Sequence, residues 1–304
     1  MEAITDRIGR GEILLADGAI GSLLMARGLA RGAAPESINL SHPEILEEIA
    51  RLYLDAGAEI IQTNTFGASP LKLANYGLAG QAAAINENAV RAVRRAGGER
   101  AYISASCGPS GKILLPYGDT HAEEMSESFH WQIEALIKAG ADILCIETMS
   151  DIHEAQLAIR AARSVSLSIP IMATMTFEAT ARGFFTIMGV SIEKACLELQ
   201  EAGADLVGSN CGNGSLQMVA IAKEFRKFSR LPLLIQSNAG VPELRAGQVH
   251  YPETPATMAA MSRELVKAGV AVIGGCCGTT PEHTRAMRRA LDEEKVADHG
   301  HSPA

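Results

Sequence analysis

A short pattern recurs four times along the chain and separates a helical stretch from an apolar run. It consists of an alanine, a glycine and a small residue, at Ala56-Gly57-Ala58, Ala139-Gly140-Ala141, Ala202-Gly203-Ala204 and Ala268-Gly269-Val270. Glycine is favoured directly after a helix, because it adopts the left-handed backbone conformation without steric cost. Each pattern therefore predicts a helix end followed by a strand, and its repetition predicts a regular alternation of the two.

Eight short apolar runs follow these points or lie between them. They occupy residues 13–17, 59–63, 101–106, 142–147, 170–176, 205–209, 231–237 and 270–274. Runs of this length between helical stretches are typical of buried parallel strands. The chain has 304 residues, of which 47% are hydrophobic, and it can supply one large core. We therefore predict an α/β protein, a single-domain (β/α)8 TIM barrel.

The composition also limits the location and the partners of the protein. We expect the barrel to occupy residues 1–291 and residues 292–304 to form a polar, frayed tail. A net charge of −8 and an aromatic content of 4% argue against a nucleic-acid surface. The sequence contains neither a signal-peptide core nor an apolar run near the ~20 residues that span a membrane. A cytoplasmic protein without a membrane partner is expected.

Three cysteines have the arrangement of a metal site. Cys276 and Cys277 are adjacent and framed by glycines, and Cys211 lies upstream in a similar setting. Adjacent cysteines form only a strained disulfide, and a reducing compartment disfavours disulfides in general. Three thiolates around zinc leave the fourth tetrahedral position open, which is typical of a catalytic site. We therefore predict that these three residues are both metal ligands and catalytic.

The cysteines and the loop after the last strand have other possible roles. Cysteine is often a small buried hydrophobic residue, and we expect that role for Cys107, Cys145 and Cys196. Residues 274–280 resemble a phosphate-binding loop, because barrel phosphate sites often follow the last strands. A phosphate loop has no use for paired cysteines, so the metal interpretation ranks higher.

Polar residues follow several of the predicted strands. Asp17, Asn64, Glu147 and Asn238 stand at four strand ends, and the three cysteines stand at two more. In a TIM barrel these ends meet at one face, where the reactive residues gather. Each polar residue alone is compatible with a helix cap or a turn. As a group they predict a site for a small zwitterionic ligand.

The motifs at these positions resemble the homocysteine S-methyltransferase family over roughly residues 11–291. The matching segments are residues 274–283, 17–21, 63–68, 210–211 and 238–240. The family includes the homocysteine-binding barrel of cobalamin-dependent methionine synthase, betaine-homocysteine methyltransferase and the S-methylmethionine-dependent enzymes. Residues 63–68 are most similar to methionine synthase.

This resemblance implies a reaction and a set of ligands. One zinc would be held by Cys211, Cys276 and Cys277, with the thiol of homocysteine as the fourth ligand. A free thiol with a pKa near 8.5 is mostly protonated at neutral pH, whereas coordination releases the proton. The resulting thiolate would attack a methyl donor and yield methionine.

The resemblance also implies how the amino-acid end of the substrate is held. Glu147 would bind the ammonium group and Asp17 would shape that pocket. The backbone amides of Gly18 and Ala19 would take the carboxylate. The remaining polar lining would come from Asn64 and Asn238.

For the methyl donor the sequence leaves one expectation and two alternatives. The chain lacks the Asp-x-His-x-x-Gly motif of cobalamin modules, so a methylcorrinoid donor is expected on a separate protein. S-methylmethionine, a betaine-type donor or a different acceptor thiol is the first alternative. The second is a module that binds zinc and homocysteine but is inactive without a corrinoid protein.

Overall fold

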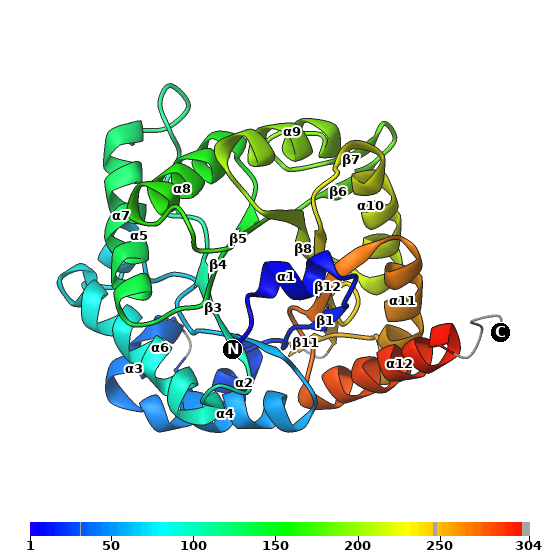
Figure 1. The fold of residues 1–304 in the computed structure, drawn as a ribbon. Helices are drawn as coiled ribbons and strands as arrows, with labels where there is room; N and C mark the ends of the chain where they lie inside the picture. The colour runs from blue at the N-terminus through cyan, green and yellow to red at the C-terminus, as the bar shows by residue number, and fades with distance from the viewer. Residues whose placement is uncertain (31, 246–247, 300–304) are drawn as a thin grey trace.

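Eight parallel strands form one sheet that curves into a barrel inside a ring of helices (Figure 1). The computed structural model describes residues 1–30, 32–245 and 248–299. The strands of the barrel are β1 (Leu14–Leu15), β2 (Ile60–Gln62), β3 (Tyr102–Cys107), β4 (Ile143–Met149), β5 (Ile171–Met175), β8 (Leu206–Gly214), β9 (Leu233–Asn238) and β12 (Val270–Gly275). Each of the eight predicted runs coincides with one of these strands, although β8 extends five residues beyond its run. The predicted (β/α)8 TIM barrel is confirmed.

Backbone hydrogen bonds close the barrel between its first two strands. β1 pairs with β12 on one side, in the register Leu14 to Val272. On the other side the Asp17 amide donates to the Ile60 carbonyl at 3.0 Å, and the Glu59 amide donates to the Leu15 carbonyl at 2.7 Å. Closure therefore leaves no free edge between β1 and β2.

Outer helices follow the strands in the predicted alternation. They are α4 (Pro43–Asp55), α6 (Ala82–Gly97), α7 (Ala122–Lys138), α8 (Ile152–Val165), α9 (Ile192–Ala202), α10 (Ser215–Phe228), α11 (Pro255–Lys267) and α12 (Pro281–His299). The four glycines of the recurring pattern have φ angles of 96°, 97°, 112° and 80°. These positive values confirm that each glycine ends a helix in the left-handed conformation.

Shorter elements lie between these or beyond the strand ends. They are α1 (Ile4–Gly9), α2 (Gly21–Ala26), η1 (Pro35–Ser37), α3 (Ile38–Ser41), α5 (Pro70–Ala74), η2 (Ala79–Gln81) and two antiparallel hairpins, β6 (Glu178–Thr180) with β7 (Gly183–Phe185) and β10 (Glu243–Arg245) with β11 (Gln248–His250). The α1 helix lies across the barrel opening in Figure 1. Its Ile4 and Ile8 side chains join the interior hydrophobic cluster, so α1 plugs that end.

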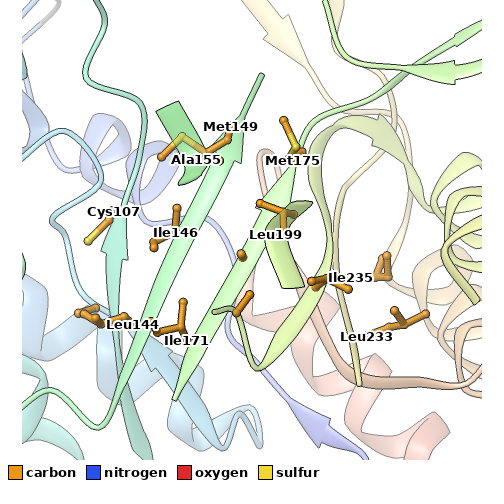
Figure 2. Close-up of a cluster of buried hydrophobic side chains, with 14 of the residues drawn as sticks. Cys107, Leu144, Ile146, Met149, Ala155, Ile171, Met175, Leu199, Leu233 and Ile235 are labelled. Atoms are coloured by element: carbon orange, nitrogen blue, oxygen red, sulfur yellow. The ribbon is translucent and has the colours of Figure 1, made fainter. Parts of the chain in front are cut away.

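Alternation along each strand divides the core into two layers. On β4, Ile143 and Cys145 belong to the cluster inside the barrel, whereas Leu144 and Ile146 pack between the sheet and the helices (Figure 2). The same alternation directs Glu147, the next interior position, toward the barrel axis. As predicted, Cys107, Cys145 and Cys196 are buried and have no disulfide partner.

The last helix extends beyond the predicted end of the barrel. α12 continues to His299, so residues 292–299 are helical where a frayed tail was expected. Arg288 pairs with Asp292 at 2.7 Å, and Arg263 of α11 contacts Glu293 and Glu294. The Arg263 contacts link residues 293 and 294 to α11, whereas the Arg288–Asp292 pair lies within α12. Residues 300–304 lie outside the described part. No helix among the described residues is long and apolar enough to cross a membrane.

Gly208 gives a test of how tightly the barrel strands pack. A Cβ atom at this position of β8 would lie 1.8 Å from the Leu234 carbonyl oxygen, whereas one at Gly80 of η2 would meet nothing within 4 Å. Gly208→Ala should therefore lower the free energy of unfolding by roughly 1–3 kcal/mol in urea denaturation. Gly80→Ala should change it by less than about 1 kcal/mol. Equal midpoints for the two variants would contradict the packing described.

Candidate active site

The sulfur atoms of Cys211, Cys276 and Cys277 form one cluster at the C-terminal face of the barrel. All three lie within 4.8 Å of one another. The Sγ atoms of Cys211 and Cys277 are 3.8 Å apart. Among the described residues, this is the one group of three or more histidine, cysteine or acidic side chains with such spacing. The structure therefore brings together the three residues that the sequence predicted as ligands.

Backbone geometry at the strand ends explains why these sulfur atoms converge. Cys211 has a φ angle of 61°, and Gly212 follows it with a φ angle of 73°. Non-glycine residues rarely adopt positive φ, and such strain concentrates at functional sites. The register of β8 against β9 shifts between Asn210 and Gly214. The turn thus takes the Cys211 side chain out of the regular strand alternation.

The cysteine pair after β12 is held by the end of β9. The Cys276 amide donates to the Ser237 carbonyl at 2.7 Å. The Cys277 amide donates to Oδ1 of Asn238 at 3.1 Å. The Thr279 hydroxyl donates to the Cys276 carbonyl at 2.7 Å. Three hydrogen bonds therefore fix the backbone from which both sulfur atoms project.

The donor set of the cluster fits zinc. Zinc prefers thiolate ligands at ~2.3 Å in a tetrahedron, so two such ligands stand about 3.8 Å apart. The separation between Cys211 and Cys277 matches this value. Hydrogen bonds from the Cys211 and Cys276 thiols lower the pKa of Cys277 below its ordinary value. Contacts with Cys211 and Cys277, together with burial, raise the pKa of Cys276, so the crowding of the three sulfur atoms favours one thiolate among them.

A cavity of about 250 Å³ opens beside the sulfur atoms. Its walls come from the loops after several barrel strands. The lining residues are Gly18, Ala19, Ile20, Gly21, Pro35, Glu36, Gln62, Thr63, Asn64, Phe66, Ser106, Glu147, Thr148, Cys211, Gly275, Cys276 and Cys277. The cavity therefore has sulfur atoms on one wall and a buried carboxyl group, that of Glu147, on another.

Glu147 is held by hydrogen bonds to both of its carboxyl oxygens. Oε1 accepts from the Ser106 hydroxyl and, at 3.3 Å, from Nε2 of Gln62. Oε2 accepts from Nδ2 of Asn210 at 3.2 Å. Burial raises the pKa of Glu147 to about 7, although the hydrogen bonds from Ser106 and Gln62 oppose that shift. A bound cation would favour its ionised form.

Ala19 and Asn64, two of the predicted binding residues, line the cavity. The backbone amide of Ala19 and the side-chain amide of Asn64 both donate hydrogen bonds to other residues of the protein. The Ala19 backbone amide donates to the Thr279 hydroxyl at 3.1 Å. Nδ2 of Asn64 donates to the Pro35 carbonyl and to Oδ1 of Asn39, both at 2.8 Å. These bonds shape the wall of the cavity, and direct contacts of Gly18, Ala19 and Asn64 with a ligand stay predictions.

Asp17 and Asn238 lie behind the cavity wall. Oδ2 of Asp17 accepts from the Gln62 amide at 2.8 Å, and its Oδ1 has no hydrogen-bond partner among the described residues. Asp17 lines a small separate cavity together with Leu46 and Ile49 of α4. Oδ1 of Asn238 supports the Cys277 amide. Both residues brace the site from outside the lining, and their contact with a ligand stays a prediction.

Several residues of the site were missed by the sequence prediction. Gln62, Ser106 and Asn210 bond Glu147, and Thr148 has a φ angle of 60° beside it. Polar residues at interior positions of strand ends are the signal that would have identified Gln62 and Ser106. The sequence places Asn210 before Cys211 and does not indicate a contact with Glu147. Its contacts depend on a turn that the pattern of residues does not reveal.

Removal of one cysteine tests the metal site. Cys276→Ala or Cys277→Ala should abolish zinc retention after dialysis, because two sulfur ligands do not hold the ion as three do. Elemental analysis measures the zinc, and circular dichroism should show an intact barrel. Cys196→Ala, a buried cysteine of α9 outside the cluster, is the matched control and should retain zinc. Zinc retention in either cluster variant, or its wholesale unfolding, would contradict a catalytic rim site.

The buried carboxyl group of Asp17 should make the stability of the folded protein depend on pH. Burial raises its pKa from 3.8 to about 8, with a further contribution from Glu147. The folded protein therefore favours the protonated form of Asp17. The stabilisation that this gives to the folded state is complete below about pH 4 and is lost as the pH rises toward 8. Asp17→Asn keeps an oxygen for the Gln62 amide and removes this titration.

The comparison requires unfolding free energies of both proteins at two pH values. The quantity compared is the unfolding free energy of Asp17→Asn minus that of the wild type. This difference should be larger at pH 8 than at pH 5 by more than about 1 kcal/mol. The same difference between the two proteins at both pH values would show that the carboxyl is not titrating in this way.

Comparisons with known proteins identify the family of this chain. The family model described as Homocysteine S-methyltransferase matches residues 14–291. The methionine synthase of Mycobacterium tuberculosis is 30% identical over 296 residues, which cover 92% of this chain and 24% of that protein. Betaine–homocysteine S-methyltransferase 1 of Rattus norvegicus is 31% identical over 318 residues, which cover 96% of this chain and 75% of that one.

A solved structure shares the fold. The metallated form of the homocysteine methyltransferase MmuM from Escherichia coli superposes with a TM-score of 0.78 at 23% identity, covering 93% of this chain and 98% of that one. The chain spans only 24% of the length of the mycobacterial methionine synthase that it matches. The family model covers nearly the whole chain, and the rat enzyme is matched over most of its length. The chain therefore belongs to the homocysteine S-methyltransferase family.

Proposed function

We propose that the protein is a zinc-dependent thiol S-methyltransferase that forms methionine from homocysteine. The observation that carries this proposal is a single cavity with three cysteine sulfur atoms on one wall and Glu147 on another. An α-amino thiol needs both features, because its thiol must become a nucleophile and its ammonium needs an anionic partner. Membership of the homocysteine S-methyltransferase family supports the same substrate.

The sulfur wall of the cavity would activate the substrate thiol. Cys211, Cys276 and Cys277 would hold one zinc ion, which as a Lewis acid lowers the pKa of a coordinating thiol. The hydrogen bonds at Cys276 and Cys277 keep the backbone fixed when a ligand enters. A fixed sulfur wall positions the substrate without reorganisation during the reaction.

The carboxyl wall would bind the amino-acid end of homocysteine. Glu147 would accept the ammonium, and its raised pKa of about 7 would fall as the cation approaches. Ser106 and Gln62 hold the carboxyl in place from the other side. Gly18 and Ala19 would face the substrate carboxylate, and Asn64 would complete the lining. Asp17 and Asn238 would act by supporting these walls.

For the methyl donor we propose a methylcorrinoid carried by a separate protein. The resemblance of residues 63–68 to methionine synthase supports this choice. Small quaternary ammonium groups are usually recognised by several aromatic rings, whereas Phe66 is the one aromatic residue among those lining the cavity. This favours a corrinoid over a betaine-type donor. S-methylmethionine stays an alternative. Free thiolate ligands need a reducing compartment, which supports a cytoplasmic location.

A donor screen tests the proposed reaction. The zinc-loaded protein is incubated with homocysteine and, separately, with free methylcobalamin, a protein-bound methylcorrinoid, S-methylmethionine and betaine. The proposal predicts methionine from the corrinoid donors. Turnover of free methylcobalamin would exclude a module that is inactive without a protein partner. If no donor yields methionine, the proposed function is wrong.

Glu147→Gln tests the role of the carboxyl wall. It removes the negative charge beside the substrate ammonium, and a hydrogen bond to a charged group is worth about 1.5–3 kcal/mol. The KM for homocysteine should therefore rise about 10- to 100-fold, while the zinc content stays unchanged. Steady-state kinetics with the active donor and elemental analysis provide the measurements.

A second buried glutamate serves as the control. Glu154 is 5% exposed and accepts from the amide and hydroxyl of Ser110, outside the cavity lining. Glu154→Gln should leave the KM for homocysteine unchanged. An equal rise in KM for both variants would mean that Glu147 acts only on the fold. Loss of zinc in Glu147→Gln would mean that this residue supports the metal.

A further inference from the structure

Asn210 lies between the two walls of the cavity and contacts both of them. It is the last interior residue of β8 before the turn at Cys211, and its side chain is 0% exposed. Its Nδ2 atom is 3.2 Å from Oε2 of Glu147 and 3.9 Å from Sγ of Cys276. One side-chain amide thus touches the carboxyl group proposed for the substrate ammonium and a proposed metal-ligand sulfur.

The orientation of this amide is fixed by its other contacts. Oδ1 accepts from the Thr148 backbone amide at 2.8 Å, and that amide can only donate. Oδ1 also accepts from the Thr174 hydroxyl at 2.8 Å. The Asn210 side chain therefore cannot rotate by 180° without setting two donors against each other. Its NH2 group must face Glu147, Cys276 and the Thr148 hydroxyl, which is 2.7 Å away, and its two hydrogens are shared among these three acceptors.

The Asn210 amide lies between two groups that carry negative charge. The Glu147 carboxylate and the sulfur ligands are both anionic when the site is in use, and they lie in a buried region. Like charges at short range disfavour each other's ionised forms. A neutral donor between them stabilises both. A hydrogen bond to a ligand sulfur also sets how much electron density that sulfur gives the metal.

From these contacts we infer that Asn210 is a positioning residue that couples the amino-acid pocket to the metal-binding sulfur of Cys276. This inference rests on the proposed function. Asn210 would touch neither the substrate nor the metal. It would hold the Glu147 carboxylate and the Cys276 sulfur in one fixed geometry, so that the ammonium and thiol ends of one amino thiol are recognised together.

Asn210→Asp tests the coupling. It preserves the size of the side chain and an oxygen for the Thr148 amide, but it replaces the shared donor by an acceptor. Thr174→Val is the matched control, because it removes a contact on the Oδ1 side and leaves the NH2 group in place. Each protein is measured with two probes, cobalt(II) alone and homocysteine.

The first measurement is the sulfur-to-metal charge-transfer band of cobalt-loaded protein without homocysteine. The second is homocysteine affinity of zinc-loaded protein by calorimetry. Asn210→Asp should shift the band and weaken homocysteine binding about 10- to 100-fold. Thr174→Val should leave the band in place and change the affinity less than about threefold, because Thr148 still holds Oδ1.

The outcomes separate the inference from the function on which it rests. A wild-type band and affinity in Asn210→Asp, or equal effects in Thr174→Val, would overturn the inference and leave the proposed function standing. A wild-type protein that binds neither probe would overturn both. If Asn210→Asp does not fold, Asn210→Ser replaces it, and the same two losses are expected because a serine hydroxyl is too short to reach both partners.

Discussion

Closure of the barrel is the constraint on which the site depends. The short strand β1 pairs with β12 on one side. On the other side, backbone hydrogen bonds in both directions join the β1 segment to the β2 segment. Because the sheet is closed, the end of β4 faces the ends of β8 and β12 across the interior. On an open sheet of the same strands, Gly18 after β1 and Gln62 of β2 would lie at opposite edges. In the closed barrel they line one cavity.

The site also buries groups that carry negative charge when ionised. Burial raises the pKa of Glu147 and of Asp17, so this part of the protein is a poor environment for their negative charges. The cysteine sulfur atoms crowd one another in the same region. Such a site gains most from cations, and the proposed zinc ion and substrate ammonium are both cations. Ligand binding would therefore relieve electrostatic strain that the fold maintains.

The sequence predicted the parts of the structure that depend on regular patterns. Apolar runs and helix-ending glycines located the strands, and position at strand ends predicted that Cys211 would meet Cys276 and Cys277. Side-chain direction beyond the strand ends was not predictable, because positive φ angles at Thr148 and Cys211 interrupt the alternation. Contacts between distant loops were not predictable either. Asn64 donates to Pro35 and Asn39, and Asp17 braces β2 behind the cavity.

The central claim is that three cysteine sulfur atoms hold zinc and leave one position for the thiol of homocysteine. X-ray absorption at the zinc edge, with and without homocysteine, tests it most directly. The account predicts three protein sulfur ligands near 2.3 Å in the zinc-loaded protein and a fourth sulfur when homocysteine is added. A sulfur count that does not change with homocysteine, or that is below three before its addition, would contradict the account.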